Sequence, residues 1–133
     1  MVARATFFIT RKPGERNNMK RAPRAYITAH WTGNQHEDMA NLEKYARALL
    51  LAGYTPVNSK LLYDAIVRKN NPEEYKAARD GAISDLLSCR QVVICGDTTD
   101  EIVKEDIAIA KHHKKDVTTL RGILEAEVFG SND

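Results

Sequence analysis

Residues 90–115, RQVVICGDTTDEIVKEDIAIAKHHKK, constrain the fold more than any other part of the chain. Residues 91–95 form a short apolar run rich in β-branched side chains, which predicts a strand buried on both faces. Residues 97–100 are all good helix N-cap types, and apolar residues then recur with helical spacing. A buried strand, a tight polar loop and an amphipathic helix make half of a βαβ unit.

Asp106 is the unusual residue of this predicted helix. With about 100° of rotation per residue, it falls inside the apolar stripe formed by Ile102, Val103, Ile109 and Ala110. A buried carboxylate is costly unless it is paired or hydrogen-bonded, and open α/β sheets bind ligands at the carboxyl ends of their strands. Two interpretations are open. Asp106 faces a ligand cavity, or it finds a backbone partner near the helix start, where the helix dipole favours a negative charge.

The remaining chain alternates between strand and helix patterns, which predicts an α/β domain with a mostly parallel sheet of about five strands. Predicted helices include one that begins at Glu37 or Asp38 and ends at Gly53, and one that starts at Pro72 and presents an inner face. That inner face consists of Tyr75, Ala78, Ala82, Ile83 and Leu86. The predicted strands cover residues 5–10, 25–29, 54–58, 91–95 and 116–120, with Pro56 favouring an edge position for the third.

Charge divides the chain into a basic N-terminal arm, residues 1–24, and a domain, residues 25–133. The arm carries seven Lys or Arg residues and one Glu, although the whole chain has a net charge of only +2. A basic arm can contact nucleic acid, but no aromatic residues alternate with these charges, which disfavours a nucleic-acid groove. No apolar run approaches a membrane span or a signal peptide, so we expect a cytoplasmic protein without membrane contacts.

Neither a metal site nor a cofactor is predicted from the sequence. Cys89 and Cys95 lack metal-type spacing and are interpreted as buried thiols, and His112 and His113 as surface residues in the last turn of a helix. The chain contains no dinucleotide fingerprint, P-loop or nucleophile elbow. What remains is a predicted pocket at the carboxyl ends of the strands, with the candidate residues Tyr26, His30, Trp31, Asn58 and Asp106.

Four motifs, in this order, resemble those of the nucleoside 2-deoxyribosyltransferase-like superfamily, in its small bacterial and phage branch. They are residues 26–33 (YITAHWTG), Asn41 with residues 53–58 (GYTPVN), residues 86–93 (LLSCRQVV) and residues 105–110 (EDIAIA). The resemblance covers most of residues 25–120. It implies a flavodoxin-like or Rossmann-like three-layer domain, a nucleoside or nucleotide as ligand, and a homo-oligomer whose sites are completed by a neighbouring subunit.

The resemblance also implies roles for individual residues. Asp106 stands at the position of a nucleophilic Glu, with Glu105 as the alternative, and Tyr26 stands at the position of a tyrosine that orients the carboxylate. The residues implied in substrate binding are His30, Trp31, Gly33, Asn58, Gly96 and Asp97. The chain departs from the pattern in having an Asp, one methylene shorter, as the nucleophile, Ala82 where many members have a second Asp, and Thr28 and Ala29 in place of loop glycines.

Three functions are therefore expected as alternatives. The first is an enzyme that cleaves or transfers an N-glycosidic bond through the carboxylate of Asp106. The second is a non-catalytic nucleotide-binding module that senses or sequesters a nucleotide or a nucleotide-derived signal. The third is a nucleic-acid contact through the basic arm, which would weaken with added salt.

Overall fold

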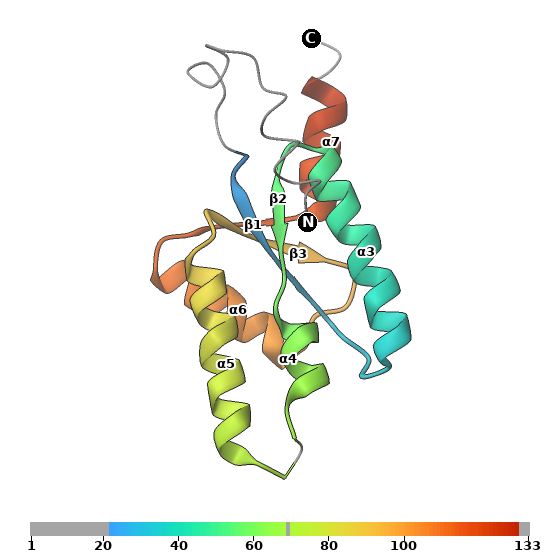
Figure 1. The fold of residues 1–133 in the computed structure, drawn as a ribbon. Helices are drawn as coiled ribbons and strands as arrows, with labels where there is room; N and C mark the ends of the chain where they lie inside the picture. Colours follow the sequence, from blue (N-terminus) through green and yellow to red (C-terminus); the bar gives the residue numbers. More distant parts are fainter. Residues whose placement is uncertain (1–21, 69, 131–133) are drawn as a thin grey trace, which may run out of the picture.

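Four parallel strands in the order β2-β1-β3-β4 form the sheet of the computed structural model, which describes residues 22–68 and 70–130 (Figure 1). The strands are β1 (Arg24–Ala29), β2 (Thr55–Val57), β3 (Gln91–Cys95) and β4 (Asp116–Thr119). The predicted parallel α/β sheet is confirmed, with four strands in the described part rather than about five. The further strand predicted at residues 5–10, and nearly all of the basic arm, lie outside the described residues.

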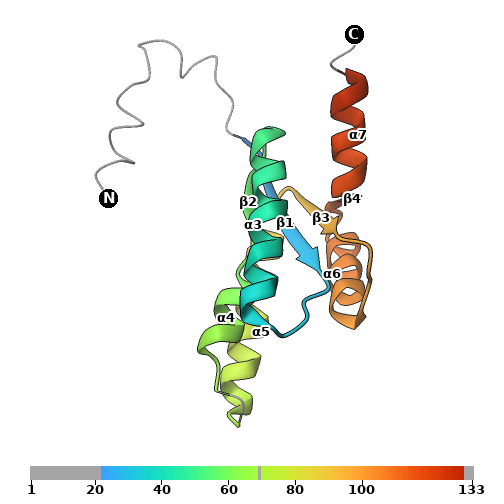
Figure 2. The same cartoon turned by 90° about the vertical axis from the view of Figure 1, so that its right-hand side faces the viewer.

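Helices cover both faces of the sheet and complete a three-layer domain (Figures 1 and 2). The inward side chains of β1 alternate between the two faces, as the pleat of a strand requires. The helices are α3 (Gln35–Leu51), α4 (Lys60–Ile66), α5 (Pro72–Leu87), α6 (Glu101–His112) and α7 (Leu120–Gly130). Ala25, Ile27 and Ala29 pack with α3 and α7, whereas Tyr26 packs with α5 and α6.

The strand order places the two most buried strands in the middle of the sheet. Both neighbours of β1 are parallel to it, and Pro56 of β2 pairs with Ala25. Proline lacks the N–H needed to continue a ladder, and the edge position of β2 makes that loss tolerable. The order reverses between β1 and β3, which is the topological switch point where ligands bind in open α/β sheets.

Helix α3 begins two to three residues earlier than the sequence predicts. Its N-cap is Asn34, whose side chain accepts a hydrogen bond from the N–H of Glu37 at 3.0 Å, so neither Glu37 nor Asp38 opens the helix. The predicted stop at Gly53 is confirmed, because this residue has a φ of +96° and its N–H bonds back to the carbonyl of Leu50. Helix α6 is capped by Asp100, one of the predicted candidates.

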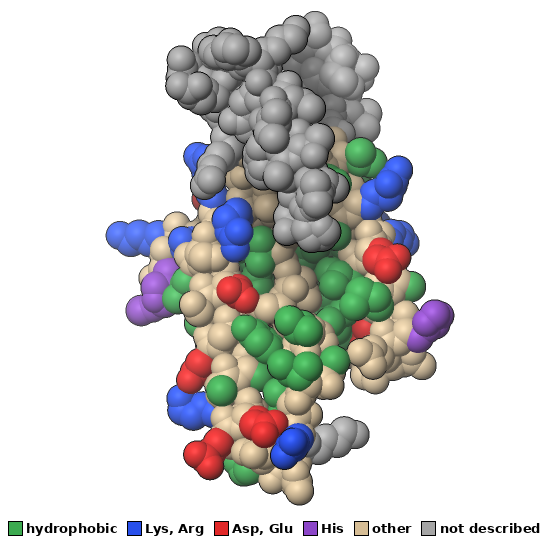
Figure 3. Space-filling model, viewed as in Figure 1, with side chains coloured by type: hydrophobic (Ala, Val, Ile, Leu, Met, Phe, Trp, Pro, Cys, Tyr) green, Lys and Arg blue, Asp and Glu red, His purple; other side chains and the backbone are tan. Residues whose placement is uncertain are grey.

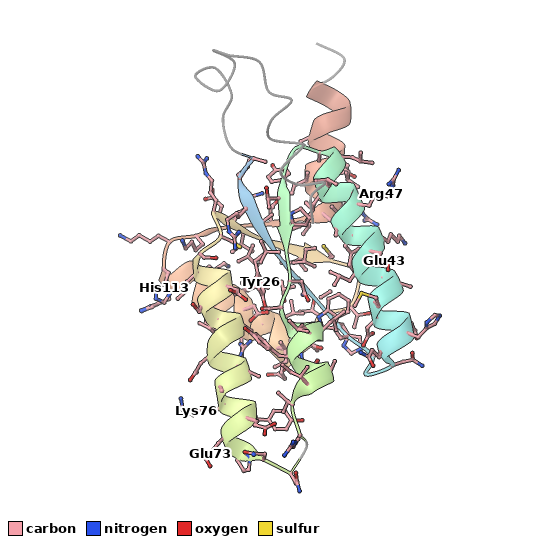
Figure 4. The ribbon with its side chains drawn as sticks, in the orientation of Figure 1. Tyr26, Glu43, Arg47, Glu73, Lys76 and His113 are labelled. Atoms are coloured by element: carbon pink, nitrogen blue, oxygen red, sulfur yellow. The ribbon has the colours of Figure 1, made fainter. Side chains whose placement is uncertain are left out.

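Tyr75 is not on a buried face of α5, contrary to the prediction, and its exposed fraction is 54%. The first turns of α5 extend past the carboxyl ends of the strands, where Glu73 and Lys76 mark the end of the helix farthest from the sheet (Figure 4). A residue there has no sheet to pack against, although it shares a helix face with Leu86. Helical spacing identifies the face but not the length over which it is covered.

The predictions for the cysteine side chains and for the paired histidines agree with the structure. Cys89 and Cys95 are both buried free thiols, while His112 and His113 are exposed at the end of α6. Among the described residues, no helix combines the length and the apolar character needed to cross a membrane.

Candidate functional site

Asp106 points into the layer between α6 and the sheet, and only 2% of its surface is exposed. Its Oδ2 accepts a hydrogen bond from the hydroxyl of Thr28 at 2.7 Å. Thr28 lies in β1 on the same face as Tyr26, so the partner of the carboxylate comes from the central sheet. The interpretation in which Asp106 only finds a backbone partner near the helix start is therefore wrong.

Arg79 of α5 is the second group that contacts this carboxylate. Its Nη2 lies 3.1 Å from Oδ1 of Asp106 and 3.1 Å from Oε1 of Glu105. The N–H has hydrogen-bond geometry toward Glu105 but not toward Asp106. Oδ1 of Asp106 is thus buried and ion-paired, yet it accepts no hydrogen bond from the described residues.

Burial controls the ionisation of this cluster. It raises the pKa of Asp106 above the ordinary value, and the hydrogen bond from Thr28 and the charge of Arg79 offset that effect only in part. Burial also raises the pKa of Tyr26, and the negative charge of Asp106 raises it further. Tyr26 therefore remains a neutral phenol at physiological pH. The hydrogen bond to the carboxylate comes from Thr28, not from Tyr26.

A cavity of about 140 Å³ lies on the outer side of Arg79, between α4, α5 and α6. Lys60, Tyr63, Asp64, Tyr75, Arg79 and Ile102 are among its lining residues. The volume is close to that of a cavity known to take a single benzene ring, about 150 Å³. Hydrophobic side chains gather over this lower part of the molecule, with charged groups interspersed (Figure 3). Asp106 is not among the residues that line the cavity, whereas Arg79, which contacts it, is.

Gly81 allows Tyr63 to form one wall of this cavity. A Cβ atom added to Gly81 would lie 2.8 Å from the Tyr63 hydroxyl oxygen and 3.0 Å from its ring. Glycine in the interior of a helix costs about 1 kcal/mol relative to alanine. This cost arises in α5 at Gly81, where the Tyr63 ring lies against the helix.

His30 and Asp100 meet above the switch point of the sheet. The Nδ1 atom of His30 lies 2.8 Å from Oδ2 of Asp100, so the pair links the loop after β1 to the loop after β3. Burial raises the pKa of Asp100, but hydrogen bonds from the Val103 N–H and from His30 together outweigh it, and the pKa ends below its ordinary value. His30 lies at the carboxyl end of β1, as predicted, and is partly exposed there.

Trp31 and Gly33 take structural positions in the loop after β1. The Trp31 ring packs against Tyr45 on the α3 face, with 6.2 Å between ring centroids, and so lies on the opposite side of the sheet from Asp106. The N–H of Gly33 donates to the carboxylate of Asp38 at 3.0 Å, and Thr32 donates to the same carboxylate through its N–H and its hydroxyl, both at 2.8 Å. The carboxylate of Asp38 thus fixes the backbone of the loop at Thr32 and Gly33.

Asn58, Gly96 and Asp97 take part in contacts that do not involve Asp106. The side chain of Asn58 donates to the carbonyl of Ile27 at 3.1 Å and accepts from the N–H of Leu61 at 3.4 Å, which ties β1 to the start of α4. Gly96 and Asp97 line a separate groove of about 690 Å³ between α3 and α7. The predicted residues therefore divide into a cluster of Asp106, Glu105 and Tyr26 around Arg79, and residues that face the other side or hold loops.

Arg79 and the hydroxyl of Thr28 are the functional groups that the sequence analysis misses. Arg79 falls between Ile83 and Leu86 on a helical projection, within the arc of the predicted inner face. A cation inside the apolar stripe of α5 and a carboxylate inside the apolar stripe of α6 together indicate an ion pair between the two helices. In the described residues, no group of three or more His, Cys, Asp or Glu side chains is placed to hold a metal ion.

The region that carries these residues coincides with a recognised sequence family. No curated protein matches the chain in sequence. A family model described as a domain of unknown function, DUF7768, matches residues 23–120, which include all four strands, Thr28, Arg79 and Asp106. The match covers well over half of the chain, and the chain therefore belongs to the DUF7768 family.

Proposed function

We propose that this protein cleaves or exchanges the N-glycosidic bond of a nucleoside or nucleotide, with Asp106 as the reacting carboxylate. The observation that carries the proposal is the burial of this carboxylate, with a raised pKa, on the face of α6 that meets β1, close to a cavity of one-ring size. Such perturbed carboxylates concentrate at functional sites. The resemblance of four motifs to the nucleoside 2-deoxyribosyltransferase-like superfamily supports the class of substrate.

The two oxygens of Asp106 suit different tasks in this chemistry. Thr28 holds Oδ2, while Oδ1 is paired with Nη2 of Arg79 at 3.1 Å and attacks the sugar once that guanidinium has moved away. Oδ1 attacks C1′, the bond between C1′ and the base nitrogen breaks, and the electron pair leaves with the base, which takes up a proton from water. Water or a second base then attacks C1′ and releases the carboxylate. Tyr26, a neutral phenol on the same face, acts as a hydrogen-bond donor rather than a base.

The test is release of free base from a panel of deoxynucleosides and their 5′-monophosphates, measured by HPLC. We expect Asp106→Asn to abolish release, because an amide cannot form the glycosyl ester. Glu105→Gln distinguishes the alternative nucleophile, and Asp80→Asn, at an exposed carboxylate of α5, is the matched control that keeps wild-type release. Full activity in Asp106→Asn would disprove the assignment.

A non-catalytic nucleotide-binding module is the second candidate, and one observation favours it. Arg79 covers Asp106 from the cavity side, so the carboxylate is not reachable in this state. Under this alternative, calorimetry detects binding of a nucleotide to the wild-type protein, and the nucleotide is recovered intact after prolonged incubation. Recovery of free base would exclude the module and favour the enzyme.

A further inference from the structure

Arg79 is shared between two carboxylates that differ in almost every respect. Asp106 is buried and receives no directed hydrogen bond from the guanidinium, whereas Glu105 is largely exposed, with 57% of its side chain accessible, and does receive one. Arg79 also lines the cavity, and 27% of its side chain is exposed. Arg79 is therefore the wall between the cavity and the carboxylate, and its contact with Asp106 is the less directed of its two ion pairs.

We infer that Arg79 is a movable cover for Asp106, and that a tetrahedral oxyanion, the phosphate of a phosphorylated ligand, draws it off by binding in the cavity between α4, α5 and α6. The inference deepens the proposed function and rests on it for the identity of the ligand. Arg79 is here a positioning residue: it controls whether Oδ1 of Asp106 can be reached.

The cavity offers two cations from different helices to such an anion. Lys60 enters from α4 and Arg79 from α5, and the planar guanidinium matches two oxygens of a phosphate or sulfate at once. Each cation already has a carboxylate partner, since Lys60 Nζ lies 2.9 Å from Asp64. An incoming anion must therefore exchange partners with these carboxylates rather than fill an empty site, so its affinity depends on how readily Arg79 leaves Asp106.

The raised pKa of Asp106 makes that exchange feasible. When Arg79 moves away, a buried carboxylate without a counterion is strongly disfavoured. Asp106 can then bind a proton or receive the electrophilic carbon of the ligand, and either event removes the isolated charge. Glu105 stays on the exposed side of α6 and can keep part of the guanidinium near its present position.

The test measures the accessibility of Asp106 directly, by carbodiimide coupling of carboxyl groups to an amine followed by peptide mass spectrometry. Sulfate is the anion probe, and sodium chloride at matched ionic strength is the reference. We expect labelling of Asp106 to be slow in chloride and to rise roughly tenfold at about ten times the dissociation constant of sulfate, because the anion binds only the uncovered state. Exposed Glu105, in the same peptide region, is labelled in both salts and serves as the internal standard.

Three variants complete the test. Arg79→Gln should be labelled rapidly at Asp106 in chloride, with no further response to sulfate. Lys60→Gln retains the Arg79 contact and should need more sulfate for the same response, so it tests the site even if Arg79→Gln folds poorly. Lys76→Gln, an exposed cation one turn from Arg79 and paired with Asp80, is the matched control and should behave as wild type.

Equal labelling of Asp106 in the two salts by the wild-type protein would overturn the inference, as would slow labelling in folded Arg79→Gln. Its failure is separable from that of the proposed function, because no turnover is measured. Sulfate-dependent labelling without any nucleotide binding or base release would retain the movable cover and reject the nucleotide. Base release that is equally fast from nucleosides and monophosphates, with labelling unaffected by sulfate, would retain the proposed function and reject the movable cover.

Discussion

Replacing Thr28 by valine tests whether the hydroxyl of β1 stabilises an ionised Asp106. Valine has nearly the same shape and is equally suited to a strand, so the change removes the 2.7 Å hydrogen bond without opening a cavity. A hydrogen bond to a charged group contributes about 1.5–3 kcal/mol, and the buried methyl returns about 0.8 kcal/mol. We therefore expect a loss of about 1–2 kcal/mol in the free energy of unfolding at pH 7.5.

The loss should shrink as the pH falls. A carboxyl group whose pKa is raised by folding contributes stability that is complete below its unfolded pKa and is lost as the pH rises through its folded pKa. The Thr28 bond lowers the folded pKa of Asp106, so the variant raises it further and loses more stability on the way to neutral pH. The difference between the two proteins cannot change faster than about 1.4 kcal/mol per pH unit for one proton.

Urea unfolding followed by the fluorescence of Trp31, the single tryptophan, gives both free energies at pH 7.5 and at pH 4.5. Thr55→Val is the matched control, since Thr55 lies on the edge strand β2 and its hydroxyl donates to the carbonyl of Ala22 at the long distance of 3.4 Å. We expect the control to change stability by less than about 0.5 kcal/mol. Equal effects of the two substitutions, or a Thr28→Val effect that is the same at both pH values, would refute an ionised Asp106 held by Thr28.

Two further predictions concern groups outside this cluster. Asp38→Ala should lower the free energy of unfolding by about 2–4 kcal/mol, because three hydrogen-bond donors from Thr32 and Gly33 lose their acceptor. A change below about 1 kcal/mol in urea unfolding would contradict that role. Burial raises the pKa of Cys95 to about 12 and also raises the pKa of Cys89. Neither thiol should therefore react with Ellman's reagent at pH 8 until the protein unfolds in guanidinium. Fast reaction of the folded protein would show an accessible thiolate.

Periodicity made most of the architecture predictable. The central strand, the capped helix after it and the edge position of β2 follow from rules that act over a few residues, and all are present. The start of α3 is not predictable in this way, because Asn34 and Asp38 are both good capping residues and local rules rank them nearly equally. The choice depends on the loop, where the carboxylate of Asp38 is already used by the backbone of Gly33.

The central residue of the candidate site was predictable because it conflicts with its own helix. Asp106 lies inside an apolar stripe, and that conflict identified it without any knowledge of its neighbours. Trp31, in contrast, has no local conflict, and its packing on Tyr45 depends on a contact across the fold. Arg79 conflicts with its stripe as Asp106 does, but its long side chain can reach solvent from a half-buried position, so the conflict is weaker.

Two energetic costs in this domain lie beside one cavity. Replacing a buried ion pair by well-packed apolar side chains is often neutral or stabilising, so Asp106 and Arg79 are not explained by stability alone. Gly81 adds a helix-interior cost of about 1 kcal/mol against Tyr63, which lines the same cavity as Arg79. Arg79, which pairs with Asp106, and Tyr63, which packs against Gly81, both line this cavity, so two departures with independent causes lie close together. Departures from folding rules that coincide in space are expected at functional sites, which is why our proposal places the function at this cavity rather than at the larger groove between α3 and α7.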